Sequence, residues 1–171
     1  MCLGIFSFQA KSSSKILTFQ VLGNCFFFTH YLLLGLTSEG SSAYVGAILN
    51  LFAVVRNGTY YYLGKKNKSG EIYYAAFFCV LCIGLSILTY ADWRSLLPMV
   101  GSAIQSFSFA CKKANKLRFF TLLGSPFWLI YNILLLSYSG IITETLCIVS
   151  MIVGIWRYRN VTEREDSKKS V

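Results

Sequence analysis

The chain has 171 residues, of which 55% are hydrophobic and 13% charged, and its formal net charge is +9. Soluble domains carry about 25% charged residues, and a chain of this length cannot hide so large an apolar fraction from water. Disordered chains and coiled coils need more charge still. The composition excludes these three classes and predicts an all-α, polytopic membrane protein.

Six apolar windows approach or exceed the roughly 20 residues that a transmembrane helix needs. In chain order they are Ile16–Thr37, Ser42–Leu63, Ile72–Ala91, Ser95–Cys111, Leu117–Ser137 and Ser139–Tyr158. Residues 1–9 are also apolar but too few to span a bilayer, so they predict a partial helix before the first full span. Because the connections are short, neighbouring helices are expected to alternate in direction.

The basic residues are divided very unevenly between the two sides of the predicted bundle. Fifteen of the sixteen fall on one side, and Arg94 alone falls on the other. The fifteen are Lys11, Lys15, Arg56, Lys65, Lys66, Lys68, Lys112, Lys113, Lys116, Arg118, Arg157, Arg159, Arg164, Lys168 and Lys169. Short cytoplasmic loops carry the excess of Lys and Arg, so this division predicts a cytoplasmic C-terminus. It also accounts for the basic charge without a nucleic-acid partner.

The sequence matches itself when it is shifted by 101 residues. Between positions 6 and 38 the shift gives 12 identities in 33 positions without a gap. Shared membrane composition explains the Leu and Phe matches, but it does not explain Lys11 on Lys112, Lys15 on Lys116 and Gly23 on Gly124. The pattern predicts an internal duplication.

The shift contains four helices, an even number, so the two copies are expected to point the same way through the membrane. This predicts a 3+1+3 plan with Ile72–Ala91 as the linker helix. The expected segments are a first triple-helix repeat over 1–63, a cytoplasmic loop and linker helix over 64–93, a second repeat over 94–158, and a polar cytoplasmic tail over 159–171. By the same alignment Met1 matches Ser102, which lies within the second copy's first helix. The first helix is therefore predicted to be truncated by roughly ten residues relative to a full span.

Three stretches carry a resemblance to a known family. "HYLLLG…AYVGAILN" (His30–Asn50), "LLPMVGSAIQSFSFACK" (Leu96–Lys112) and "WLIYN…GIITETLCIVSMIVGIWRYR" (Trp128–Arg159) resemble the bacterial YgjV inner-membrane family. That family is distantly similar to the SWEET, PQ-loop and PnuC-type transporters, whose SWEET members share the plan of parallel repeats. The resemblance implies a bacterial inner-membrane location and transport of a small molecule.

Catalytic and metal-binding motifs are not found in the sequence. The single histidine, His30, cannot form a multi-histidine metal site. Cys79 and Cys82 have CxxC spacing but lie within an apolar helix, and no second pair accompanies them. We therefore expect no metal, no cofactor and no enzymatic activity. An intramembrane enzyme using His30 and Glu144 is the least favoured alternative.

Polar side chains within the predicted spans mark the expected solute pathway, because such groups usually face a bundle interior or a cavity. Asn24 and Tyr31 lie seven residues apart on one helix face, and the 101-residue shift matches them to Ser125 and Asn132. The full set of candidate pathway residues is Asn24, Tyr31, Asn50, Gln105, Ser125, Asn132 and Glu144. The resemblance to SWEET proteins, which place an Asn on the third helix, singles out Asn50.

These residues also have a purely structural interpretation. Asn and Gln often form hydrogen bonds between membrane helices, and Glu144 could be hydrated near the outer end of its helix. A hydrogen bond between helices is likewise the preferred role for His30.

The two prolines, Pro98 and Pro126, lie on the first two helices of the second copy. A proline removes an intrahelical hydrogen bond and can kink a helix. The SWEET pattern has prolines at the hinges of alternating access, so both are candidate hinges, with a static kink as the alternative.

The sequence as a whole favours a SWEET-like facilitative transporter of a small neutral polar solute, working by alternating access within the lipid bilayer. Few charges lie within the spans, which argues against obligatory coupling to an ion. A membrane receptor or scaffold that keeps the fold without transporting is the alternative. The solute and any homo-oligomeric state are left open.

Overall fold

The computed structural model describes residues 7–10, 12–39, 41–66 and 72–158. Residues 67–71 of the predicted cytoplasmic loop, the predicted tail at 159–171 and positions 1–6 of the predicted partial helix lie outside these ranges. Within the described residues every regular element is a helix, and there is no strand.

Six α-helices account for the six predicted spans. They are α2 (Ser13–Leu34), α3 (Ser41–Lys65), α4 (Ile72–Leu88), α5 (Leu96–Ala110), α6 (Ala114–Leu134) and α7 (Tyr138–Arg157). A π-helical turn, η1 (Gly35–Glu39), extends α2, and a 3-10 turn, η2 (Trp93–Ser95), precedes α5. Residues 7–9 form a further helical turn at the start of the described chain.

The helix ends differ from the predicted windows for local reasons. α2 begins three residues before its apolar window because the Ser12 hydroxyl accepts a hydrogen bond from the backbone N–H of Lys15 at 3.3 Å. Asp92 caps η2 in the same way through the backbone N–H of Arg94. Polar caps set these boundaries, whereas the hydropathy windows follow apolar content alone.

Three segments are long and apolar enough by themselves to cross a membrane: Ser13–Thr37, Ala114–Leu134 and Tyr138–Arg157. α4 is apolar but has 17 residues, and α5 has 15. The chain is therefore an all-helical protein with three clear candidate spans among its described residues.

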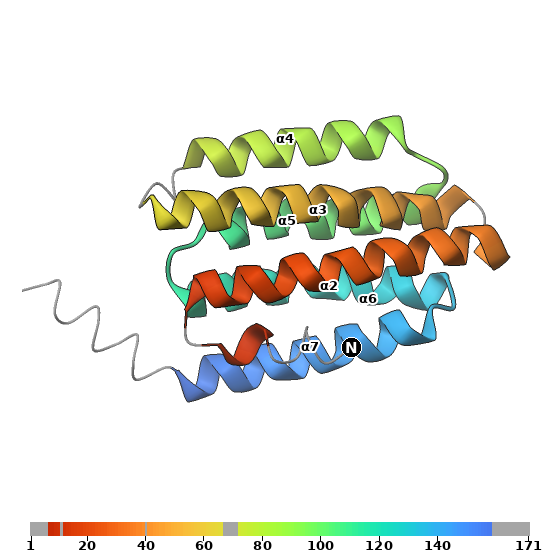
Figure 1. The fold of residues 1–171 in the computed structure, drawn as a ribbon. Coiled ribbons are helices and arrows are strands. Elements are labelled where there is room, and N and C mark those ends of the chain that lie inside the picture. The colour runs from red at the N-terminus through yellow and green to blue at the C-terminus, as the bar shows by residue number, and fades with distance from the viewer. Residues whose placement is uncertain (1–6, 11, 40, 67–71, 159–171) are drawn as a thin grey trace, which may run out of the picture.

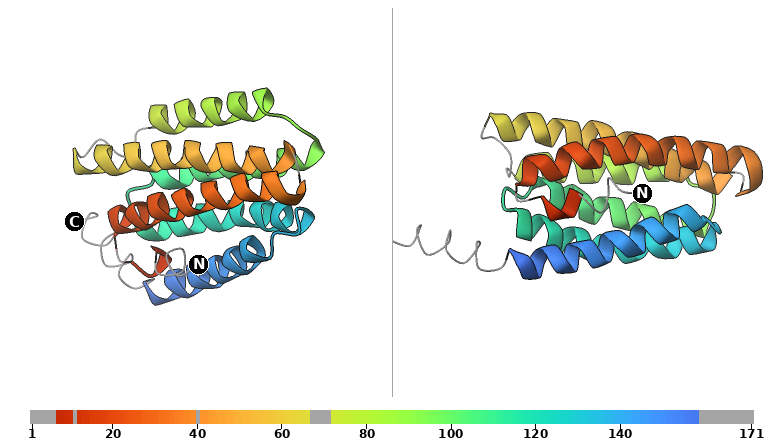
Figure 2. Two further views of the ribbon diagram at one scale, coloured as in Figure 1. Left: turned by 45° about the vertical axis from the view of Figure 1, so that its right-hand side comes forward. Right: turned by 60° about the horizontal axis from the view of Figure 1, so that its bottom comes forward.

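The helices run alternately in opposite directions, and in the middle of the bundle α5 lies behind α3 and α6 behind α2 (Figures 1 and 2). α2 packs along α3, and α6 packs between α5 and α7. α4 lies at one edge and packs mainly on α5, while α7 lies at the opposite edge (Figure 1). The helical turn at residues 7–9 lies beside α7, where Gln9 donates to the backbone oxygen of Ser150 at 2.9 Å.

Two glycines allow α5 and α6 to approach closely. A Cβ atom built on Gly124 would lie 2.9 Å from the carbonyl oxygen of Gly101, and the reverse contact would be 3.1 Å. Small residues at such crossings let the backbones meet, as is common between membrane helices.

Two of the basic residues counted above as topology markers are buried. Arg56 and Arg118 both have 0% exposure. Arg56 donates to the Ser102 carbonyl at 3.0 Å, which joins α3 to α5. Arg118 donates to the carbonyl of Phe8 at 2.8 Å, which joins α6 to the N-terminal turn. Both arginines therefore stabilise helix packing, although the sequence analysis counted them among the charges that set the orientation in the membrane.

Candidate substrate cavity

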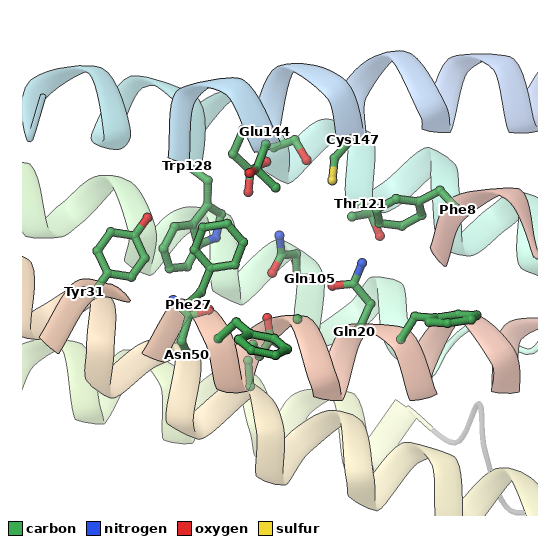
Figure 3. A pocket seen from close by; sticks show the side chains of 17 residues that line it. Phe8, Gln20, Phe27, Tyr31, Asn50, Gln105, Thr121, Trp128, Glu144 and Cys147 are labelled. Atoms are coloured by element: carbon green, nitrogen blue, oxygen red, sulfur yellow. The ribbon is translucent and has the colours of Figure 1, made fainter. Parts of the chain in front are cut away.

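A cavity of about 80 Å³ lies within the bundle, between α2 on one side and α6 and α7 on the other. Figure 3 shows side chains of these walls, to which α3 contributes Asn50 and α5 contributes Gln105. Six of the seven predicted pathway residues line it: Asn24, Tyr31, Asn50, Gln105, Ser125 and Glu144. The seventh, Asn132, lies next to it and bonds to Tyr31. Five different helices thus bring the predicted residues together.

The amide side chains of the cavity keep much of their hydrogen-bonding capacity. Asn50 donates through Nδ2 to the Gly46 carbonyl of its own helix at 2.8 Å, and its Oδ1 has no partner in the described part of the chain. The Asn24 and Gln105 side chains make no hydrogen bond to any described residue. Unpaired amide groups on a cavity wall can bind the polar groups of a solute.

Glu144 belongs to the cavity wall. It is half-buried on α7 and lines the cavity together with Ser125 of α6. The interpretation of Glu144 as a hydrated residue of the outer interface did not anticipate this placement. Among the described residues that line the cavity there is no Lys, Arg or His.

A buried group of three polar residues, which we call the tyrosine cluster (Tyr31, Tyr131 and Asn132), borders the cavity. The Tyr31 hydroxyl donates to Asn132 Oδ1 at 2.7 Å, and each member of the cluster is at most 1% exposed. The Tyr131 hydroxyl donates to the Ser42 carbonyl at 2.6 Å and accepts from the Gly46 N–H at 3.1 Å. Hydrogen bonds therefore join α2 to α6 and α6 to the backbone of α3, and the rings of Tyr31 and Tyr131 pack between these two sets of bonds.

Comparison with known proteins places this architecture in a family. The family model Imp-YgjV, described as a bacterial inner membrane protein, matches residues 1–162. The chain belongs to the Imp-YgjV family. No curated protein and no solved structure gives a significant match. The family match includes every helix that contributes to the cavity, and it agrees with the apolar helices in assigning the chain to the bacterial inner membrane.

His30 lies outside the cavity of this Imp-YgjV protein. Its Nε2 atom lies 2.8 Å from the Ser137 hydroxyl, so it joins α2 to the connection between α6 and α7. This is the kind of interhelical hydrogen bond expected for it. The geometry does not bring His30 and Glu144 into one site, because only Glu144 lines the cavity.

The two prolines occupy different environments in the Imp-YgjV chain. Pro98 is the third residue of α5, within the first helical turn, where a missing N–H costs little. Pro126 lies inside α6 with its ring exposed on the bundle surface. The position of Pro98 is typical of a helix start, so Pro126 is the better placed of the two candidate hinges.

Aromatic residues of the cavity and of the tyrosine cluster were missed in the sequence. Trp128 and Phe27 line the cavity, and Tyr131 belongs to the cluster. A weak signal was available for Trp128, which lies at helical spacing from Ser125 and Asn132, and for Tyr131, which lies three residues after Trp128. In an aromatic-rich membrane chain that signal does not separate inward rings from rings in lipid.

Proposed function

We propose that this Imp-YgjV protein is a SWEET-like facilitative transporter that carries a small polar solute by alternating access. The observation that carries the proposal is the polar cavity, whose walls come from five helices and include amide groups without partners in the described chain. Such groups within a membrane bundle are costly unless they serve a solute or a structural contact. The orientation with a cytoplasmic C-terminus is part of the same proposal.

Hydrogen bonds at matched positions support the duplication on which alternating access would depend. Ser7 donates to the Ile16 carbonyl at 3.3 Å, and Ser108 donates to the Leu117 carbonyl at 2.7 Å. The donor and the acceptor of the second bond each lie 101 residues after those of the first. Two segments that form the same local contact behave as copies of one structural unit.

The tyrosine cluster supports a closed state at one side of the cavity. Tyr31 lines the cavity, while Tyr131 bonds to Ser42 in the first turn of α3. By the division of basic residues, this end of α3 faces outward. Opening toward the outside would require the Tyr31–Asn132 hydrogen bond to break, and α2 would then separate from α6.

The Asn50→Leu variant tests the proposal. A thermal-shift screen of the purified protein against sugars, nucleosides and vitamins first supplies a solute, whose flux is then measured in proteoliposomes. The substitution removes one intrahelical hydrogen bond and the Oδ1 acceptor that the cavity offers. We expect flux to fall at least tenfold with little change in melting temperature, because a site built on hydrogen bonds discriminates strongly against lost partners.

Leu51→Ala is the matched control, since Leu51 is an exposed neighbour on the same helix outside the cavity wall. Full flux in Asn50→Leu at unchanged stability would exclude Asn50 from the pathway. Saturable binding by the wild-type protein without any flux would instead favour the receptor or scaffold alternative.

Labelling of single introduced cysteines tests the orientation. Ser69→Cys should be protected from an impermeant thiol reagent in intact cells, and Ser41→Cys should react. Labelling of position 69 from outside would reverse the assignment.

A further inference from the structure

Glu144 is the one carboxylic acid among the described residues of the cavity wall, and no described basic residue pairs with it. The buried arginines are engaged elsewhere: Arg56 binds oxygens of α5, and Arg118 binds the Phe8 and Ala10 carbonyls. An intramembrane carboxylate without a counter-ion in the protein is unfavourable, and such residues generally serve an ion or a ligand. The part of the chain that the structure describes therefore offers this cavity no positive charge to balance Glu144.

Aromatic rings surround the same space. The Phe27 and Tyr31 ring centroids lie 6.1 Å apart, and the Tyr31 and Trp128 centroids lie 6.2 Å apart, so the three rings form a continuous wall. Figure 3 shows Phe27, Trp128 and Glu144 around one part of the cavity. The faces of aromatic rings attract cations by about 0.5–2 kcal/mol each, and most strongly where water is excluded.

We propose that the cavity binds a small organic monocation, a protonated or quaternary amine that also carries a polar group. Its charged nitrogen lies between the Glu144 carboxylate and the aromatic wall, and its polar group meets the amides of Asn24, Asn50 and Gln105. This inference rests on the proposed function and names the solute class of the same site. It replaces the expectation of a neutral solute that the sequence analysis favoured.

The volume of about 80 Å³ favours a small amine, because it holds several water molecules but not a nucleoside. A hydroxylated amine such as choline matches both the charged part and the amide part of the wall. Its neutral isostere, 3,3-dimethylbutan-1-ol, has the same shape with carbon in place of the charged nitrogen. The pair therefore isolates the contribution of charge.

The test compares binding of choline and 3,3-dimethylbutan-1-ol to the purified full-length protein by calorimetry, and repeats the comparison with ethanolamine and propan-1-ol. We expect each cation to bind at least tenfold more tightly than its neutral partner. Glu144→Gln, which keeps the shape of the side chain, should remove that preference. Asp92→Asn, which removes a carboxylate outside the cavity, should leave it unchanged.

If Glu144→Gln does not fold, Phe27→Leu tests the cation site instead. It should weaken cation binding severalfold and leave binding of the neutral alcohols unaltered. Equal affinity within both pairs, or no cation binding at millimolar concentrations, would overturn the inference. A second result would also overturn it: flux of a neutral solute that depends on pH in the wild-type protein but not in Glu144→Gln. In that case Glu144 would carry a proton and would not pair with a cation.

The two levels of the proposal fail in different ways. Saturable choline binding without choline flux in proteoliposomes supports the cation site and contradicts transport. Saturable flux of a neutral solute, with no preference for cations, keeps transport and contradicts the cation site.

Discussion

Tyr31 donates a 2.7 Å hydrogen bond to Asn132, the residue 101 positions further along the chain. That separation equals the shift at which the sequence matches itself. Equivalent positions of two copies meet directly only near an axis that relates them. The contact therefore supports an approximate two-fold relationship between α2 and α6, with the tyrosine cluster near the axis.

Tyr31→Phe should lower stability by about 1 kcal/mol, the typical size of a hydrogen bond between membrane helices. Asn132 Oδ1 would lose its donor in a fully buried position. The measurement is the melting temperature of the detergent-purified variant. Tyr73→Phe, on an exposed ring of α4, serves as the control and should melt with the wild type. Identical melting of all three proteins would show that the bond contributes nothing.

The matched glycines Gly23 and Gly124 should respond in opposite ways to substitution by leucine. A Cβ atom at Gly124 would meet the Gly101 carbonyl oxygen at 2.9 Å. A Cβ atom at Gly23 would point into open space, with no atom beyond its own helix backbone within 4 Å. Gly124→Leu should separate α5 from α6 at a cost of at least about 2 kcal/mol. Gly23→Leu should fold normally and fill part of the cavity, so that binding of the solute falls while the melting temperature holds. A larger loss of stability in Gly23→Leu than in Gly124→Leu would contradict the packing described for α5 and α6.

Arg56→Ala should destabilise the protein by about 2–4 kcal/mol, because it removes buried hydrogen bonds and leaves a cavity. The guanidinium donates to Asn57, Ser102 and Ser106 at 3.0–3.2 Å and lies over the rings of Phe52 and Phe109. The 101-residue shift supplies the control. Arg157 is exposed, so Arg157→Ala should cost less than about 0.5 kcal/mol. Equal melting temperatures for the two variants would mean that Arg56 does not stabilise the contact between α3 and α5.

Asp92 should contribute to stability in a pH-dependent way. Desolvation acts to raise its pKa, but hydrogen bonds from Ser42 and Arg94 outweigh it and hold the pKa below the ordinary value of 3.8. A carboxyl group with a lowered pKa stabilises the fold above the ordinary pKa, and this contribution disappears as the pH falls through the lower, folded value. Asp92→Asn should therefore cost up to about 1 kcal/mol at pH 7, and the difference from the wild type should shrink below pH 3.8. Thermal melts across that range measure it, and a difference that grew on acidification would reverse the assignment.

The sequence was informative about the helices and about residues aligned along one helix face. Hydropathy located all six helices because each one needs an apolar window. The positions of Asn24 and Ser125 could be predicted because polar groups are costly in lipid and the shift matched them. Candidate pathway residues could be predicted on each helix separately. That they line one cavity could not be predicted, because it depends on how the helices pack against one another.

Other features could not be predicted for physical reasons. The positive-inside rule counts basic residues near the helix ends but does not say how deeply their side chains are buried. Arg56 was therefore counted among the loop charges, although its side chain is fully buried in the bundle. Aromatic side chains serve equally well against lipid and inside a bundle, which concealed Trp128 and Tyr131. Glu144 was predicted as a pathway residue, but its distance from the helix end suited a hydrated position equally well, because the sequence does not show which helices pack beside it.

The short helix α4 has a consequence for the surrounding bilayer. Its 17 residues rise about 25 Å, less than the roughly 30 Å of hydrocarbon in an average membrane, and side chains such as Tyr73, Phe77 and Ile87 are exposed along it. A spanning segment shorter than the hydrocarbon layer thins the lipid around it or recruits a neighbour. In the proposed topology α4 crosses the bilayer, so its edge of the bundle is a site of hydrophobic mismatch, and lipid chain length should influence how the protein distributes and associates within the inner membrane.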